Sequence, residues 1–422
     1  MTIIQRRNFL SLCFSASSAT LLAGQSGFSK IPFARSSNLE HKTDELAADL
    51  VIAGGGLGGC AAALAACRNG LKIILTEETD WIGGQVSQQG VPPDEHPWIE
   101  TRGAPASYRR YRNRIRDYYR RNYPLSKNAR NRKHLNPGDG SVSRICHEPR
   151  VSVAVLYEML APFISSGKLS ILLNTKIIAA DTDGDLVKAL QACDAITGNK
   201  TVLNASCFID ATECGDLLPL SGTEYITGTE SKRQTNELHA PDIADSQNNQ
   251  AFTFCFAMDY QPGANNVIDK PKKYGFWRSY VPQLQPPWPG RLLQLHYSNP
   301  RTLQPKRLGF HPEGKESGDL LNLWLYRRLI NKDNFLPGTY DGDITLVNWP
   351  QNDYFLGNLI DVSEKEFNHH VENARQLSLS LFYWLQTEVP RPDGKQGWPG
   401  LRLRGDIMGT QDGMAKYPYI RE

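Results

Sequence analysis

The chain has 422 residues, of which 40% are hydrophobic and 22% charged, and its formal net charge is +3 at pH 7. This composition is ordinary for a soluble globular enzyme, and so small a net charge argues against a dedicated nucleic-acid-binding protein. The length predicts two domains, or one domain with a large insertion.

The first residues have the pattern of a targeting segment. Arg6 and Arg7 precede an apolar, small-residue run that extends to Gly24 without an acidic residue. Twin arginines before a weakly hydrophobic stretch resemble a twin-arginine export signal, and the run is too short for a stable membrane span. An ordinary basic N-terminus or a membrane anchor is the alternative. We expect an exported protein, periplasmic or extracellular, with signal and linker over residues 1–35 and polar linker sequence continuing to Glu45.

The stretch after this linker has the pattern of a dinucleotide-binding unit. Residues 50–53 form a short apolar run, as expected of a strand buried on both faces. Gly54, Gly56 and Gly59 follow it as G-x-G-x-x-G. Glycines at these positions permit a tight turn, the approach of a diphosphate to the backbone and close packing of the next helix. The sequence therefore predicts a strand and a phosphate-binding turn.

The residues that follow complete the unit. Residues 60–67 are rich in alanine and predict a helix, and residues 71–75 predict a second strand. Glu77 then stands where a carboxylate accepts hydrogen bonds from a ribose. A glycine-rich turn that only packs a helix would not explain this acid, so we interpret the stretch as a dinucleotide site.

A second glycine pair strengthens this interpretation. Residues 79–85 read T-D-W-I-G-G-Q, and Gly83-Gly84 lets backbone N–H groups approach a ligand. Together with the fingerprint, this motif resembles flavin-dependent oxidoreductases of the glutathione-reductase-like FAD fold. Within them it resembles a bacterial family of FAD-dependent oxidoreductases with xanthan-lyase-like members. The resemblance implies FAD as the cofactor, with these binding residues: Gly54, Gly56, Leu57, Gly58, Gly59, Glu77, Gly83, Gly84 and Gln85.

Residues 108–122 (YRRYRNRIRDYYRRN) predict a basic helix. Tyr108, Tyr111, Ile115 and Tyr118 form one apolar-aromatic stripe, with arginines around it. The arginines are either an anion-binding face for an acidic substrate or a phosphate, or the solvated side of a helix that covers the FAD domain.

Cys146, His147 and Glu148 precede another amphipathic helix. Adjacent residues rarely converge on one atom, and the eight cysteines include no C-x-x-C, so we predict no metal site. His147 is the candidate catalytic base, because histidine titrates near neutral pH and the stretch resembles the family's. The sequence assigns no other catalytic residue.

Residues 169–205 predict strands joined by turns, which would form a β-meander inserted in the FAD domain. The next strand, residues 207–210, ends in Ala211 and Thr212. This ending resembles the Ala-Thr-Gly motif of the same flavoprotein class, in which the chain turns back under the cofactor. By resemblance, Ala211 and Thr212 contact FAD, while Glu213 stands where the common motif has glycine. Asp216 is either a polar contact or the cap of the following helical turn.

The rest of the chain predicts a substrate-side region. Residues 251–260 predict an aromatic strand, residues 320–330 a short helix and residues 343–347 a strand. The polar-aromatic loop over 348–354 suits a sugar or another polar substrate, or is an ordinary turn. Ser363 opens a long helix through a capping box.

The predicted fold class is α/β. A Rossmann-like FAD-binding domain with an inserted β-meander spans residues 48–225, and a second, mixed α+β substrate domain spans residues 226–422. In the flavoproteins that the chain resembles, a late strand, glycine turn and helix re-enter the FAD domain. No such segment follows Gly400, so we expect a C-terminal truncation.

The resemblance implies an FAD-dependent oxidoreductase that transfers a hydride between flavin and a small polar, carbohydrate-related substrate. An NAD-dependent dehydrogenase is an alternative because NAD shares the ADP half of FAD, although Gly83-Gly84 and residues 210–212 favour FAD. A truncated, non-catalytic flavoprotein fragment is another alternative. We expect a small-molecule partner and no nucleic acid, and the sequence predicts neither the oligomeric state nor the electron acceptor.

Overall fold

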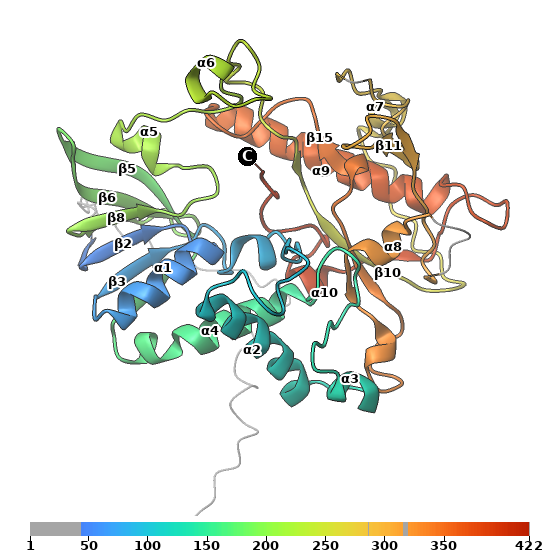
Figure 1. Cartoon of the computed structure of the whole chain (residues 1–422), viewed down its shortest axis with the longest axis horizontal. Helices are drawn as coiled ribbons and strands as arrows, with labels where there is room; N and C mark the ends of the chain where they lie inside the picture. Colours follow the sequence, from blue (N-terminus) through green and yellow to red (C-terminus); the bar gives the residue numbers. More distant parts are fainter. Residues whose placement is uncertain (1–43, 286, 315–319, 422) are drawn as a thin grey trace, which may run out of the picture. The chain divides into compact units, whose positions relative to one another are not determined.

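A computed structural model describes residues 44–285, 287–314 and 320–421 (Figure 1). The predicted export signal over residues 1–35 lies outside these residues. All the described residues belong to one compact unit, so the boundary between residues 225 and 226 stays a prediction.

The dinucleotide stretch folds as the sequence predicts. It forms β2 (Leu50–Ala53), α1 (Leu57–Arg68) and β3 (Ile73–Thr76), and every residue of both strands is buried. β2 pairs in parallel with β3 and with β8 (Cys207–Asp210), and β4 (Leu169–Leu172) pairs in parallel with the outer side of β3. The sheet order is β4-β3-β2-β8.

The two faces of this parallel sheet pack against different layers. Leu50 and Ile52 of β2 belong to the core that includes α1 and α4 (Pro149–Ser165), while Val51 and Ala53 pack against the β-meander. This follows from the strand geometry, because successive side chains point to opposite faces. In Figure 1, α1 and α4 lie on one side of β2 and β3, and β5 and β6 on the other.

The predicted β-meander is present from residue 175 onwards, whereas residues 169–172 join the parallel sheet as β4. β5 (Thr175–Asp183), β6 (Leu186–Asp194) and β7 (Lys200–Asn204) pair antiparallel in chain order. β1 (Asp44–Ala47) adds a parallel strand beside β7, so the last residues of the predicted linker are wrongly assigned. All four residues of β1 are exposed, so no apolar alternation announces the strand, and its pairing with β7 forms it.

A second sheet carries the other half of the chain. β10 (Phe256–Tyr260) and β14 (Ile344–Val347) form its centre, with β13 (Arg328–Ile330) and β16 (Leu401–Leu403) at the edges, and all pairs are antiparallel. The long helix is α9 (Glu364–Thr387), which begins with the predicted capping box. The predicted α/β fold class with a second mixed part is confirmed.

Two elements of this half differ from the prediction. The strand expected over residues 251–260 is interrupted into β9 (Phe252–Thr253) and β10, because β9 pairs with β15 (Asp353–Tyr354) instead of joining the larger sheet. The helix expected over residues 320–330 is shorter than predicted. Only α8 (Leu323–Tyr326) is helical, and the following residues pair with β14.

The remaining helices and strands connect these layers. They are η1 (Gly84–Val86), α2 (Ala106–Asn122), α3 (Lys127–Asn131), α5 (Leu217–Ser221), α6 (Lys232–Thr235), α7 (Tyr274–Ser279), β11 (His296–Ser298), β12 (Pro305–Arg307), η2 (Lys332–Asn334), η3 (Pro350–Asn352) and α10 (Gly405–Met408). Of the helices that the structure describes, none has the length and apolar character that crossing a bilayer requires.

Candidate functional site

The first glycine turn lies at the carboxyl end of β2. Gly54 has a φ of +97°, and a Cβ there would lie 2.1 Å from the carbonyl oxygen of Ala211. A Cβ on Gly59 would lie 2.0 Å from the carbonyl oxygen of Gly54. Neither position therefore accepts a side chain. Gly56 precedes α1 without a side-chain cap, which leaves the first N–H groups of the helix available to an anion.

Glu77 lies directly after β3 and is buried beside this turn. Its Oε2 accepts a hydrogen bond from the Gly55 N–H at 3.1 Å, and its Oε1 accepts from the Thr79 N–H at 2.8 Å and the Thr79 hydroxyl at 3.0 Å. Burial raises the pKa of Glu77 to about 7, although the hydrogen bonds from Thr79 oppose that shift. The carboxyl group is thus fixed at the edge of the turn.

The second glycine turn lies against the first. The Gly83 N–H donates to the Gly55 carbonyl oxygen at 2.8 Å, and Gly83 and Gly56 form a parallel β-bridge. Gln85 follows in η1, and its side-chain amide donates to the carbonyl oxygen of Pro92 at 3.3 Å. The two glycine motifs, which are separate in the sequence, therefore lie side by side. Their contact with FAD stays a prediction.

The end of β8 closes the turn from the other side. The Ala211 N–H donates to the Ala53 carbonyl oxygen at 2.7 Å, and Thr212 donates to Asp210 through its N–H at 2.9 Å and its hydroxyl at 2.7 Å. Asp216 precedes α5 but forms no side-chain cap, and the Leu217 N–H donates to Asp210 instead at 2.8 Å. Asp210 therefore caps the turn that we assigned to Asp216 as one alternative.

These segments enclose a narrow cavity of about 20 Å³, which is room for little more than one water molecule. The predicted cofactor residues that line it are Gly54, Gly56, Glu77, Ala211 and Thr212. Leu57 and Gly58 lie elsewhere, on an apolar cavity of about 340 Å³ between α1, α2 and α4. The N–H groups at the start of α1 suit a diphosphate. Glu213 and Tyr417 also line the narrow cavity.

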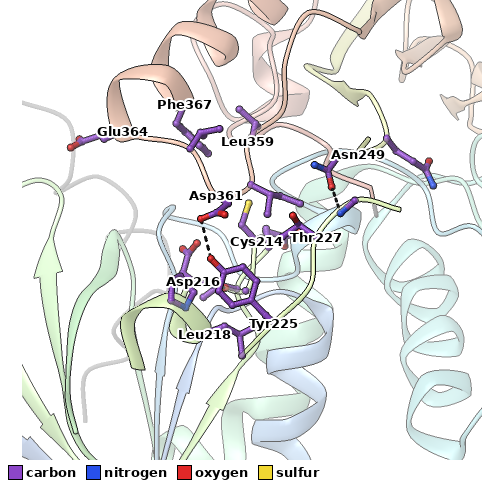
Figure 2. Close-up of a pocket in the computed structure, with 18 of the residues that line it drawn as sticks. Cys214, Asp216, Leu218, Tyr225, Thr227, Asn249, Leu359, Asp361, Glu364 and Phe367 are labelled. Atoms are coloured by element: carbon purple, nitrogen blue, oxygen red, sulfur yellow. Dashed lines mark hydrogen bonds between the residues drawn. The ribbon is translucent and has the colours of Figure 1, made fainter. Parts of the chain in front are cut away.

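A larger cavity of about 1280 Å³ shares residues with the narrow one (Figure 2). Asp216 and Leu218 lie on one side of it, and Asp361 and Phe367 on the other, with Tyr225 donating to Asp361 at 3.0 Å. No residue of the loop over 348–354 is among its lining residues.

The charged residues of the large cavity are mostly acidic. Its lining includes one lysine, Lys176, and five carboxylic acids: Glu78, Glu213, Asp216, Asp361 and Glu364. The Lys176 ammonium lies 3.5 Å from Glu78 and 3.9 Å from Asp216. Within the described residues, no three His, Cys, Asp or Glu side chains are grouped so as to hold a metal ion.

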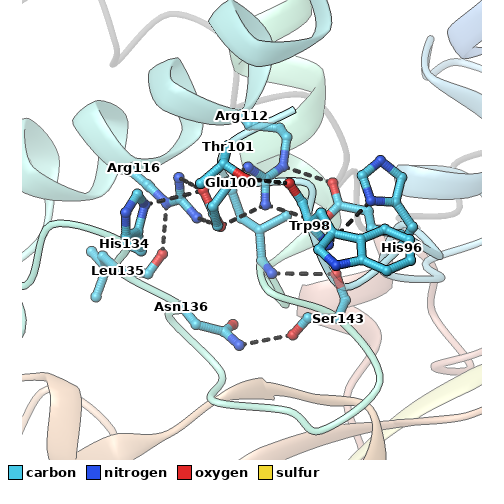
Figure 3. A network of polar contacts seen from close by, with 12 residues as sticks. His96, Trp98, Glu100, Thr101, Arg112, Arg116, His134, Leu135, Asn136 and Ser143 are labelled. Carbon is cyan, nitrogen blue, oxygen red and sulfur yellow. Dashed lines mark hydrogen bonds and ion pairs between the residues drawn. The ribbon is translucent and has the colours of Figure 1, made fainter. Parts of the chain in front are cut away.

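Helix α2 resolves the two interpretations of the basic helix. The buried apolar residues of this helix are Tyr111, Ile115 and Tyr119. Tyr118, which we predicted in the stripe, is only half-buried. Arg112 and Arg116 are buried too and bind Glu100 at 2.8 and 2.5 Å (Figure 3). The helix covers the core, as one interpretation predicts, but two arginines belong to internal ion pairs that the sequence did not reveal.

His147 lies in the core. Its Nδ1 is 2.7 Å from the Ile145 carbonyl oxygen and its Nε2 is 2.6 Å from the Ser152 hydroxyl, which is 2.8 Å from the Tyr111 hydroxyl. Because a carbonyl only accepts, Nδ1 carries the proton and Nε2 accepts from Ser152. Burial lowers the pKa of His147 to about 4, so the ring is neutral at neutral pH. Its catalytic role stays a prediction.

The comparison with protein families identifies one match. The model of the family described as FAD dependent oxidoreductase matches residues 49–422. Among curated proteins, none matches the chain.

Solved structures show distant similarity. A glycerol-3-phosphate dehydrogenase from Bacillus halodurans, complexed with FAD, is 14% identical over 52% of this chain and 41% of that chain, with a TM-score of 0.30. A p-nitrophenol 4-monooxygenase from Pseudomonas putida is 14% identical over 52% and 49%, with a TM-score of 0.29. An L-proline dehydrogenase from P. horikoshii is 16% identical over 45% and 25%, with a TM-score of 0.23. The chain therefore spans a quarter to a half of these proteins.

Proposed function

The chain belongs to the FAD dependent oxidoreductase family, and from that premise we propose that it transfers a hydride between flavin and a small polar substrate. FAD is the cofactor of the family, which removes the alternative of an NAD-dependent dehydrogenase. The observation that carries the proposal is the meeting of the first glycine turn, the buried Glu77 and the end of β8 around one cavity, which shares lining residues with a much larger one.

The residues at this point suit the ADP half of the cofactor. The N–H groups at the start of α1 would hold the diphosphate, because the amino end of a helix favours negative charge. Glu77 would accept a hydrogen bond from a ribose hydroxyl, since Gly55 and Thr79 already fix its position. When bound, FAD supplies the isoalloxazine ring that accepts or donates a hydride. The protein's part is to bind and orient.

The large cavity favours a substrate that is not an anion. Five carboxylic acids and one lysine line it, so a negatively charged ligand would be repelled. The hydroxyl and amide groups of Tyr225, Asn249 and Asn368 suit a ligand rich in hydroxyl groups. We propose a neutral polyol or sugar, or an amine, as the substrate class.

The visible spectrum of the purified protein tests the cofactor. We expect flavin absorbance bands, and their absence from protein incubated with FAD would contradict the proposal. Anaerobic incubation then tests the substrate class, with flavin bleaching as the readout. Neutral sugars, polyols and amines should bleach the flavin, whereas their carboxylate analogues should not. Bleaching by carboxylates alone would overturn the substrate assignment and leave the cofactor assignment intact.

We also propose that the protein is exported through the twin-arginine route. Arg6 and Arg7 before an apolar run support this proposal, and a protein that binds a large cofactor while folding suits a route for folded chains. Replacing both arginines by lysine should retain the protein in the cytoplasm, as cell fractionation would measure. Unchanged export of this double variant would contradict the proposal.

A further inference from the structure

Glu213 stands at the junction of the two glycine turns. A Cβ added at Gly84 would lie 2.8 Å from Glu213 Oε1, and one added at Gly56 would lie 3.2 Å from the same oxygen. A carboxylate oxygen therefore rests against the backbone of both turns. This is the place where glycines normally admit a diphosphate.

In the described part of the chain, the carboxylate at this junction has no cationic partner. Within the described residues, no Lys or Arg forms an ion pair with Glu213, and the nearby Lys176 is engaged by Glu78 and Asp216. The titratable groups that face Glu213 from the surrounding segments are Glu77, Glu78, Lys176, Cys214, Asp216 and Tyr417. Burial raises the pKa of Glu213, and the neighbouring Gln89 amide opposes that rise.

The space around Glu213 indicates where it can move. The narrow cavity at the glycine turns holds about 20 Å³, whereas the large cavity holds about 1280 Å³, and Glu213 lines both. The diphosphate of FAD carries negative charge of its own. A charged carboxylate in contact with it in a half-buried site would repel it strongly.

We propose that Glu213 is an internal competitor for the diphosphate site. Its carboxylate occupies the junction of the glycine turns in the FAD-free protein, and it takes up a proton or turns into the large cavity when FAD binds. This inference rests on the proposed function, because it requires FAD to bind at the glycine turns. Glu213 thereby limits the affinity for FAD and makes that affinity increase as the pH falls.

The experiment is a titration of the full-length, FAD-free protein with FAD, followed by flavin fluorescence from about pH 5 to about pH 9. If one proton is taken up on binding, the Kd of the wild type rises up to tenfold for each pH unit above the pKa of Glu213. Glu213→Gln keeps the shape of the side chain and removes the charge. It should bind FAD about tenfold more tightly at pH 8 and lose this slope.

Glu364→Gln is the matched control. Glu364 is another acid of the large cavity, on the first turn of α9, and its loss removes the same charge away from the glycine turns. This control should bind FAD as the wild type does, with the same dependence on pH. An equal gain in affinity for FAD in both variants would show that the effect comes only from the lower negative charge of the protein. That result would overturn the proposal.

A second variant and a second probe keep the outcomes distinct. Glu213→Asp withdraws the carboxylate by one methylene and should bind FAD more tightly than the wild type while keeping part of the slope. Inorganic diphosphate, used as a competitor, should gain affinity in Glu213→Gln by the same factor as FAD. If the wild type binds FAD and Glu213→Gln binds it no more tightly, the proposed role of Glu213 is wrong and the proposed function stands. If no variant binds FAD at any pH, the proposed function fails as well.

Discussion

Two groups of buried and half-buried acids in this protein are held in opposite ways. One group lies around α2, where Glu95 and Glu100 contact Arg112 and Arg116. Arg112 reaches Glu95 at 2.7 Å and Glu100 at 2.8 Å, and Arg116 reaches Glu100 at 2.5 Å. The arginines hold the pKa of Glu100 down at about 2, against the opposing effect of burial.

The other group lies at the glycine turns. Glu77 is bound only by neutral donors, and burial raises its pKa to about 7. Glu213 has no ion pair in the described part of the chain, and its pKa is raised too. In these two groups, the acids matched to arginines hold the loop before α2 against the helix, whereas Glu77 and Glu213 lie without a cation at the point where we propose that FAD binds.

The strongest test of the comparison is Arg112→Met. This change leaves Glu95 and part of the Glu100 interaction without a buried cation. Removal of one member of a buried ion pair costs about 3–5 kcal/mol, and we expect a loss of that size in the free energy of unfolding. Urea denaturation measures it, with Arg109→Met as the control, because Arg109 is exposed on the same helix and should change stability by less than about 0.5 kcal/mol. Equal losses in both variants would show that the arginine network is not structural.

The second test uses pH to separate the two groups. Folded Glu77 keeps its proton up to about pH 7, whereas its ordinary pKa is 4.5, so the folded state binds more protons between these values. Stability therefore falls as the pH rises through this window, by up to about 3 kcal/mol for this group. Glu100 acts in the opposite sense. Its stabilisation is present above pH 4.5 and is lost as the pH falls towards 2.

Glu77→Gln isolates the first effect. Urea denaturation of the FAD-free protein at about pH 4.5 and about pH 8 should show that the wild type loses stability over this range relative to the variant. A difference between wild type and variant that stays constant with pH would contradict the raised pKa. The Glu77 carboxyl would then be ordinary, and the contrast with Glu100 would disappear.

The third test concerns the first glycine turn, beside which the second group of acids lies. In Gly59→Ala, the new Cβ would meet the Gly54 carbonyl oxygen at 2.0 Å, so α1 must move away from β2. We expect a loss of about 1–3 kcal/mol in the free energy of unfolding and a large loss of FAD affinity. Gly58→Ala is the control in the same helical turn, because a Cβ there meets no atom within 4 Å. It should stabilise the helix by roughly 0.5–1 kcal/mol. If both variants retained FAD equally, the proposal that FAD binds at the first glycine turn would be wrong.

How far the sequence predicts each region follows from the range of the interactions. The strand, glycine turn and helix over residues 50–68 are predictable because each step depends on neighbouring residues. The pairing of Arg112 with Glu95 and Glu100 is not, because it requires the loop before α2 to fold back onto the helix. Strand β1 escaped prediction for a similar reason, since only its pairing with β7 forms it.

The same reasoning applies within the candidate site. The glycines, Glu77 and the end of β8 were found from local motifs and from the family resemblance, and the fold brings five of the predicted residues to one cavity. Glu213 was noticed only as a departure from the motif. Its contact with Gly56 and Gly84 depends on how three distant segments pack, which no local pattern encodes.

The last test concerns His147, a buried titratable group that belongs to neither group of acids. Among the residues that the structure describes, its ring has no ion partner. A carbonyl and a hydroxyl engage its two nitrogens, and burial lowers its pKa to about 4. His147→Ala leaves the Ile145 carbonyl without its partner and the Ser152 hydroxyl with Tyr111 alone, which should cost about 1–3 kcal/mol in the free energy of unfolding. Because the ring stays neutral above about pH 5, the pH profile of flavin reduction should keep its shape.

Ser152→Ala, which removes one of the two partners, should give a smaller loss and the same profile. If His147→Ala instead removes a limb of the profile between about pH 5 and about pH 8, the histidine is the catalytic base and proton transfer reaches further into the core than these hydrogen bonds indicate.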